Sequence, residues 1–140
     1  MIARSWGRRA LQCSVLLGAL VPIMAGAAGV FVGPGITGDV ALAAVSLDSH
    51  FRYLSGLLLG VGLCFASFVP RIEKRNPSFQ ILAFIVFIGG LGRLYALLTV
   101  GTPNLGMLFG LGMELLVTPS LAVGQYVLSR RDPHTDYPPA

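Results

Sequence analysis

The chain has 140 residues, of which 54% are hydrophobic and only 11% are charged, and its formal net charge is +4. A soluble domain usually carries about a quarter charged residues, so this chain has too few to cover a surface that faces water. A membrane crossing needs about twenty apolar residues, so a chain of this length can hold four spans but no additional soluble catalytic domain. The basic residues lie at the ends of apolar runs and form no stripe interleaved with aromatic residues, which argues against nucleic-acid binding.

Apolar runs long enough to span a hydrocarbon core follow one another along the chain. They extend over residues 11–32, 51–69, 79–100 and 105–128. The bilayer core offers no water to backbone N–H and C=O groups, so each run is predicted to be a helix. We therefore expect an all-α membrane protein, with a compact four-helix bundle forming one transmembrane domain at residues 11–130. A basic segment at residues 1–10 precedes this domain.

The basic residues of the termini and connections all fall on one side of a four-span topology. These residues are Arg4, Arg8, Arg9, Arg71, Lys74, Arg75, Arg130 and Arg131. The connections of the other side, residues 33–48 and 101–104, contain no Lys or Arg. The positive-inside rule then predicts that both termini are cytoplasmic. We also expect a short interfacial helix after Asp39 and a disordered cytoplasmic tail at residues 131–140.

The first apolar run has an alternative interpretation as a signal peptide cleaved at Ala25-Gly26-Ala27. The apolar sequence continues beyond this site to Val32, and the run is longer than the apolar region of a usual signal peptide. An uncleaved first helix is therefore the favoured interpretation.

Two charged residues lie deep within the apolar runs, Arg93 in the third and Glu114 in the fourth. A charge in lipid costs at least ~2.5 kcal/mol, so it normally faces other helices and finds a partner there. Counted from Pro103, Arg93 lies ten residues back and Glu114 lies eleven residues forward. At about 1.5 Å per residue, the two positions reach nearly the same depth in an antiparallel hairpin. The spacing predicts an ion pair between the two helices.

Arg52 opens the second run on the predicted outer side, without an evident partner once Arg93 and Glu114 are paired. We expect it to reach the same cavity, which gives a candidate polar cluster of Arg52, Arg93 and Glu114. The rim of this cluster is expected to include Asp48, His50 and Tyr95. Small residues recur every three or four positions from each charged residue, and so share its face of the helix. This pattern predicts close helix packing at Gly56, Gly60, Gly89, Gly106 and Gly110.

Three interpretations of the cluster stay open at this point. The Arg93–Glu114 pair can be purely structural and fix the register of two helices, which is the interpretation we favour. The cluster can bind an anionic or polar ligand, such as a lipid headgroup or a carboxylate metabolite. Glu114 can also relay a proton or an ion, although the inner half offers no further chain of acidic residues.

No enzyme signature is found in the sequence. It contains no HExxH motif, no GxSxG motif, no phosphate-binding loop and no paired carboxylates. Cys13 and Cys64 both fall toward the predicted cytoplasmic side and lack clustered His or Asp partners, so they are expected to be packing residues. We expect no catalytic activity, no metal and no cofactor.

Several short motifs resemble a known family. They are the segment HFRYLSGLLLG that begins at His50, the segment GLGRLY that begins at Gly90, the Gly101-Thr-Pro turn, and the segment MELL that begins at Met113. Together they resemble the bacterial four-helix membrane family catalogued as domain of unknown function 4345. The resemblance extends from the first helix to Arg130 and places the family's arginine and glutamate positions at Arg52, Arg93 and Glu114. It implies a compact bundle in the bacterial cytoplasmic membrane and no established activity. In architecture the chain also resembles the DoxX-like small membrane proteins.

We expect a non-enzymatic accessory subunit or assembly factor, embedded in the lipid bilayer, that binds another membrane protein or a second copy of itself through its helix faces. The alternative is a binder or carrier of a small anionic or polar molecule, or of a lipid headgroup, through the cluster of arginine and glutamate.

Overall fold

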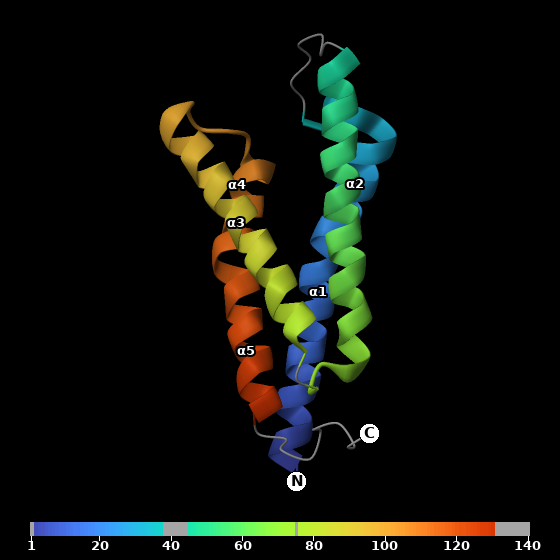
Figure 1. Cartoon of the computed structure of the whole chain (residues 1–140), viewed down its shortest axis with the longest axis vertical. Coiled ribbons are helices and arrows are strands. Elements are labelled where there is room, and N and C mark those ends of the chain that lie inside the picture. The colour runs from blue at the N-terminus through green and yellow to red at the C-terminus, as the bar shows by residue number, and fades with distance from the viewer. Residues whose placement is uncertain (1, 38–44, 75, 131–140) are drawn as a thin grey trace. The chain divides into compact units, whose positions relative to one another are not determined.

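The computed structural model describes residues 2–37, 45–74 and 76–130, and this part of the chain is built from helices (Figure 1). The longest α-helices are α1 (Ile2–Val32), α2 (Val45–Phe68) and α3 (Pro77–Thr99). A fourth helical stretch combines α4 (Leu105–Gly112), the π-helix Met113–Val117 and α5 (Thr118–Arg130). Short 3-10 helices at Gly33–Thr37 and Val69–Arg71 follow α1 and α2.

Four of these stretches are long and apolar enough to cross a membrane, namely Trp6–Ile36, Leu47–Arg71, Pro77–Thr99 and Leu105–Arg130. The predicted all-α fold with four membrane-spanning helices is confirmed. The short helix expected after Asp39 and the tail expected at residues 131–140 lie outside the described residues. The cytoplasmic location of the termini stays a prediction.

The chain divides into two units. Unit 1 contains Met1–Val15 and Phe68–Ala140, and unit 2 contains Leu16–Ser67. The single transmembrane domain expected at residues 11–130 stays a prediction.

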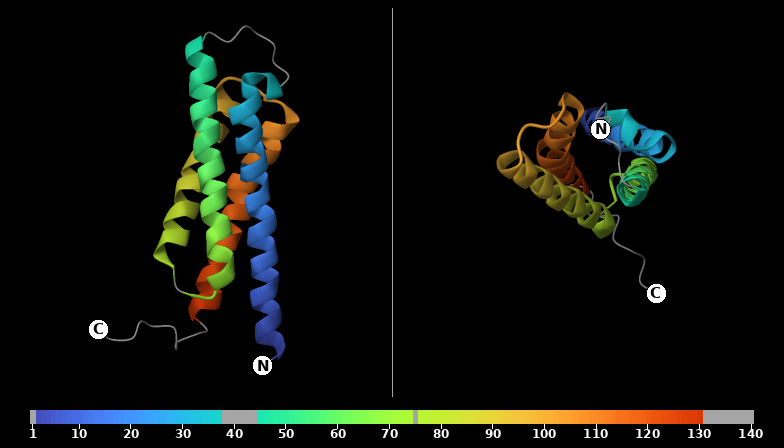
Figure 2. Two further views of the ribbon diagram at one scale, coloured as in Figure 1. Left: turned by 90° about the vertical axis from the view of Figure 1, so that its right-hand side faces the viewer. Right: turned by 90° about the horizontal axis from the view of Figure 1, so that it is seen from above.

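Unit 2 is a helical hairpin in which the later part of α1 runs antiparallel beside α2 (Figure 2). Two glycines allow the backbones to approach closely. A Cβ atom added at Gly26 would lie 2.5 Å from the backbone nitrogen of Leu59, and one added at Gly62 would lie 2.9 Å from that of Ile23. No side chain fits at such distances, so this pair of helices packs by the close backbone contact that small residues permit in membranes.

Unit 1 is held at one end by two glutamines that the sequence analysis did not single out. Gln125 is 2% exposed, and its Nε2 donates to the carbonyl oxygens of Lys74 at 2.8 Å and Ile72 at 3.4 Å. The Nε2 of Gln80 donates to Oε1 of Gln125 at 2.8 Å and to the carbonyl oxygen of Ala122 at 3.0 Å. Buried amide groups need such partners, and here they fix α5 to both α3 and the connection before it.

The starts of α3 and α4 are set by asparagine caps. The Asn76 side chain accepts the N–H of Ser78 at 3.0 Å, and Pro77 occupies the first turn, where its missing N–H removes no helical hydrogen bond. The Asn104 side chain accepts the N–H of Met107 at 3.0 Å. The Asn104 cap closes the short turn between α3 and α4, which places the two helices in one hairpin.

The fourth span is not the continuous α-helix that its apolar pattern predicts, because a π-helix interrupts it at Met113–Val117. Pro119 has no N–H to donate to the carbonyl of residue 115, and its ring would crowd that carbonyl in an α-helix. The N–H of Thr118 bonds instead to the carbonyl of Met113, and its Oγ1 donates to the same oxygen at 3.0 Å. The wide turn thus accommodates the proline, and Glu114 lies within it.

Candidate functional site

Arg93 of α3 and Glu114 of the π-helix form a bidentate ion pair within unit 1. The Nε of Arg93 lies 3.0 Å from Oε2 of Glu114, and its Nη2 lies 3.0 Å from Oε1. The predicted pair is therefore confirmed. The Arg93 side chain is 31% exposed and that of Glu114 is 15% exposed, so most of the surface of both side chains is covered by other residues.

Small residues on both sides make room for this ion pair. A Cβ atom at Gly90 would lie 2.9 Å from the Cβ of Glu114 and 2.7 Å from Cδ2 of Leu115, so α3 closely approaches the π-helix there. A Cβ atom at Gly110 would lie 3.9 Å from Cζ of Arg93, so the guanidinium packs beside α4. The remaining nitrogen of Arg93, Nη1, lies 2.8 Å from the Sδ of Met107. Each of the three guanidinium nitrogens therefore has a partner.

Not all of the glycines expected at helix contacts have a close neighbour within their own unit. Cβ atoms added at Gly60 and Gly89 would meet no neighbour within 4 Å in the part of the chain that the structure describes. At Gly106 the neighbour is Asn104, the cap of the same helix, and at Gly56 it is Val30 at an ordinary 3.9 Å. Within unit 1 the close contact of α3 lies at Gly90, one position after Gly89, and within unit 2 a close contact of α2 lies at Gly62, two positions after Gly60.

Arg52 has partners within unit 2, which corrects the expectation that it lacks one. Its Nε lies 2.8 Å from Oδ2 of Asp48, and its Nη2 lies 3.3 Å from Oδ1. Its Nη1 donates to the carbonyl oxygens of Val30 at 2.6 Å and Phe31 at 3.2 Å. The last carbonyls of a helix lack partners and carry partial negative charge, so a guanidinium is well suited to cap them. Arg52 thus ties the end of α1 to the start of α2.

The chain turns away from this cap through Gly33, whose φ is +78°. A residue with a side chain adopts this left-handed conformation at a cost of about 1 kcal/mol. A Cβ atom there would also lie 2.6 Å from Nη2 of Arg52. Glycine therefore lets the guanidinium lie directly against the end of α1.

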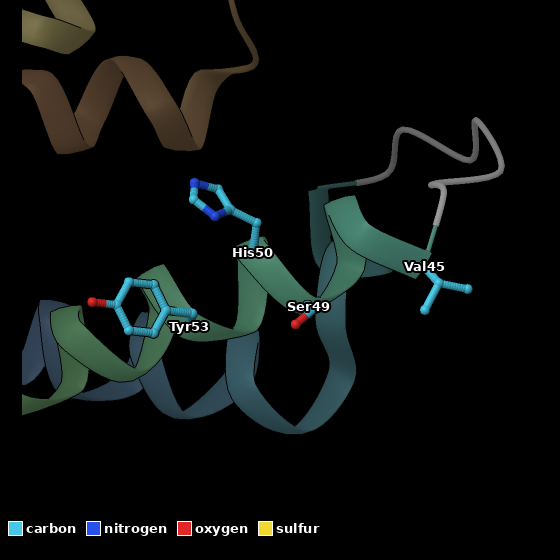
Figure 3. Close-up of a pocket in the computed structure, with 4 residues that line it drawn as sticks. All are labelled: Val45, Ser49, His50 and Tyr53. Carbon is cyan, nitrogen blue, oxygen red and sulfur yellow. The ribbon is translucent and has the colours of Figure 1, made fainter.

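The expected rim residues have different surroundings. Asp48 is the carboxylate partner of Arg52. His50 is exposed and borders an open hollow of about 550 Å³ together with Val45, Ser49 and Tyr53 (Figure 3). Tyr95 is 69% exposed and belongs to unit 1. The structure thus brings Arg93 to Glu114 and Arg52 to Asp48, and the meeting of the two pairs, which belong to different units, stays a prediction.

The two cysteines and the other potential ligands define no metal site in the described ranges. Among residues 2–37, 45–74 and 76–130, no group of three His, Cys, Asp or Glu side chains could hold a metal ion. Cys13 and Cys64 are free and exposed, so they do not fill the interior as expected.

Chemically, both arginines serve as internal donors. The Arg93–Glu114 pair is neutral as a unit, and a bidentate carboxylate is among the strongest partners that a guanidinium can have. The Arg52 guanidinium divides its hydrogen bonds between a carboxylate and two backbone carbonyls. In the part of the chain that the structure describes, both guanidinium groups are thus engaged by acceptors of the protein itself.

The comparison with known proteins agrees with the resemblance noted from the motifs. The profile of a family described as a domain of unknown function (DUF4345) matches residues 10–125, a stretch that includes Arg52, Arg93 and Glu114. No curated protein and no solved structure matches the chain significantly. Because the profile covers more than half of the sequence, the chain belongs to the DUF4345 family.

Proposed function

We propose that this protein is a non-enzymatic accessory protein of the bacterial cytoplasmic membrane, a subunit or assembly factor that associates with another membrane protein. In this proposal both termini are cytoplasmic, as the distribution of basic residues favours. The observation that carries the proposal is a contrast within α3. Arg93 is neutralised inside unit 1, and the exposed face of α3 beside it is apolar, with glycines at which an added Cβ atom would meet no neighbour among the described residues.

The internal neutralisation supports a structural role for the charges. Arg93 donates from all three nitrogens to Glu114 and Met107, so an incoming anion would have to displace a bidentate carboxylate. Arg52 is engaged in the same way. These contacts weigh against the alternative of a carrier that binds anionic molecules through the two arginines. They favour a pair that sets the register of its hairpin.

One face of α3 has the composition of a helix-docking surface. We call it the α3 outer face, and it consists of exposed residues that recur at helical spacing: Ile85, Ile88, Gly89, Gly92 and Ala96. Added Cβ atoms at Gly89 and Gly92 would meet nothing within 4 Å among the described residues. A glycine inside a helix costs about 1 kcal/mol relative to alanine, and no contact of Gly89 or Gly92 with the described residues of unit 1 offsets this cost. A helix of another membrane protein would gain close backbone contact at these positions.

The test replaces the unfilled glycines with leucine. The variants Gly89→Leu and Gly92→Leu should abolish co-purification of partner proteins from native membranes in mild detergent, as measured by quantitative mass spectrometry. Leucine suits a lipid-facing helix, so both variants should keep the thermal stability of the parent protein. Gly112→Leu is the matched control, because an added Cβ there also meets nothing within 4 Å but the residue lies on the fourth span. An unchanged set of partners in all three variants would refute docking through the α3 outer face.

A further inference from the structure

A hollow of about 290 Å³ lies in unit 1 between the first turns of α3 and the last turns of α5. Its walls include Pro77 and Ile81 from α3, and Gln125 and Tyr126 from α5. The amide groups at its base bond to one another and to backbone carbonyls, as described above. The polar groups of the wall are therefore largely satisfied, and the open space suits an apolar guest.

Two cationic residues, Lys74 and Arg130, lie at the edge of this hollow. The guanidinium carbon of Arg130 lies 4.6 Å from the centroid of the Tyr126 ring, and Tyr126 lines the hollow. The carbonyl of Lys74 accepts a hydrogen bond from Gln125, so this exposed residue adjoins the wall. The acidic residue of the same connection, Glu73, is paired with Arg8 at 3.1 Å. Among the described residues, neither Lys74 nor Arg130 has a carboxylate partner, and the edge is positively charged.

The hollow lies where the chain leaves the membrane. Pro77 is the first residue of the third span and Arg130 is the last residue of the fourth. A guest at this height has its apolar part in the hydrocarbon core and its polar part at the level of the headgroups. Basic residues at this level attract anionic lipids, and a guanidinium binds phosphate oxygens well.

We propose that this hollow binds an anionic phospholipid, with part of one acyl chain between α3 and α5 and the phosphate between Lys74 and Arg130. The volume lies just below the usual range for ligand pockets, so the hollow has room for a segment of one acyl chain and not for a whole lipid. A second copy of this chain is a poor occupant, because its own positive edge would be repelled. This inference is independent of partner docking through the α3 outer face.

The test measures lipid selectivity of the full-length protein in nanodiscs by native mass spectrometry. Phosphatidylglycerol and phosphatidylcholine with identical acyl chains compete at equal amounts. The parent protein should retain phosphatidylglycerol in preference. A basic residue near an anionic surface contributes about 1 kcal/mol, which is about a fivefold change in affinity. The double variant Lys74→Gln/Arg130→Gln should therefore lower the preference by roughly 25-fold.

Two matched controls separate this site from general attraction to the surface. Arg9→Gln removes an exposed cation of the same unit that does not line the hollow, and it should leave the preference nearly unchanged. Ile81→Trp should fill the hollow and reduce retention of the lipid, whereas Phe84→Trp, on the same helix but outside the hollow, should not.

Three results would overturn the proposal. They are equal retention of the two lipids by the parent protein, equal losses in Arg9→Gln and the double variant, and full retention of phosphatidylglycerol in a folded Ile81→Trp variant. The first result would show that the protein does not distinguish the two headgroups. The second would show that the preference comes from the overall positive charge and not from Lys74 and Arg130. The third would show that the acyl chain does not bind in the hollow.

Discussion

The Arg93–Glu114 pair gives the sharpest prediction for stability, because removing one partner and removing both have opposite consequences. Glu114→Leu leaves a guanidinium in the membrane span, and a guanidinium cannot lose its proton. Breaking a buried pair in this way costs 3–5 kcal/mol in soluble proteins, and an unpaired arginine costs about 2.5 kcal/mol on insertion scales. Arg93 is 31% exposed, which lowers the expected loss to about 2–4 kcal/mol.

Arg93→Met should be less harmful than Glu114→Leu. A carboxylic acid left alone in the span can take up a proton and shed its charge, so we expect a loss of about 1–3 kcal/mol. The double variant Arg93→Met/Glu114→Leu leaves no charge behind and should unfold within about 1 kcal/mol of the parent protein. The resulting double-mutant cycle should give a coupling energy of at least ~2 kcal/mol.

The free energy of unfolding is measured by reversible titration with a denaturing detergent in mixed micelles, followed by circular dichroism. The double variant should also keep its partner proteins in the co-purification assay. Additive single effects, with a coupling energy below ~0.5 kcal/mol, would refute the reasoning that the pair acts as a unit. A well-folded double variant that loses its biological activity would refute the purely structural role.

Four further variants test the contacts of Arg52 and the packing around the Arg93–Glu114 pair. Arg52→Gln removes the charged donor from the carbonyls at the end of α1. Amide hydrogen exchange should therefore become faster around that end of the hairpin in unit 2. Unchanged exchange there would contradict the role of Arg52 as a cap. Gly90→Ala should lower the free energy of unfolding in the same titration by about 1–3 kcal/mol, because its Cβ would overlap the π-helix. Gly89→Ala should raise the free energy of unfolding by up to ~1 kcal/mol, because its Cβ meets no neighbour within 4 Å among the described residues. Pro119→Ala restores the missing N–H and should convert the π-helix to an α-helix, which turns Glu114 away from Arg93. The coupling energy between Arg93 and Glu114 should then be lower when the double-mutant cycle is repeated in this variant. An unchanged coupling energy would show that the wide turn does not position the carboxylate.

The sequence predicts what depends on length, depth and hydropathy. The four spans follow from apolar runs, and the Arg93–Glu114 contact follows from the nearly equal distances of the two residues from Pro103. In a hairpin with one short turn, residue count translates directly into depth, so the partner is determined once the turn is identified.

The sequence says less about contacts that depend on backbone geometry. The partners of Arg52 include two carbonyls, which every residue possesses and which therefore give no signal in the chain. Asp48, four residues earlier on the same helix, was a visible candidate at salt-bridge spacing but was expected only at the rim. Pro119 inside an apolar run is the one signal in the sequence for the interruption of the fourth span.

Which of two neighbouring glycines contacts another helix also depends on backbone geometry. A stripe drawn through the charged residues selects Gly89, whereas the close approach of α3 to the π-helix occurs at Gly90, one position further along. A shift of one residue rotates the face by about 100°, so a periodic pattern alone does not distinguish the two faces of a helix that is apolar all round. The paired amides of Gln80 and Gln125 were visible as polar residues within spans and are the better signal of an inward face.

The position of the ion pair within one hairpin has a consequence for biosynthesis. Arg93 leaves the ribosome 21 residues before Glu114. At about 5–20 residues per second, roughly one to four seconds pass in which α3 carries a cation whose counter-charge has not yet been made. If the third span entered the lipid alone, it would carry an unpaired positive charge into the hydrocarbon core. The pairing therefore favours insertion of the third and fourth spans together, as a complete hairpin.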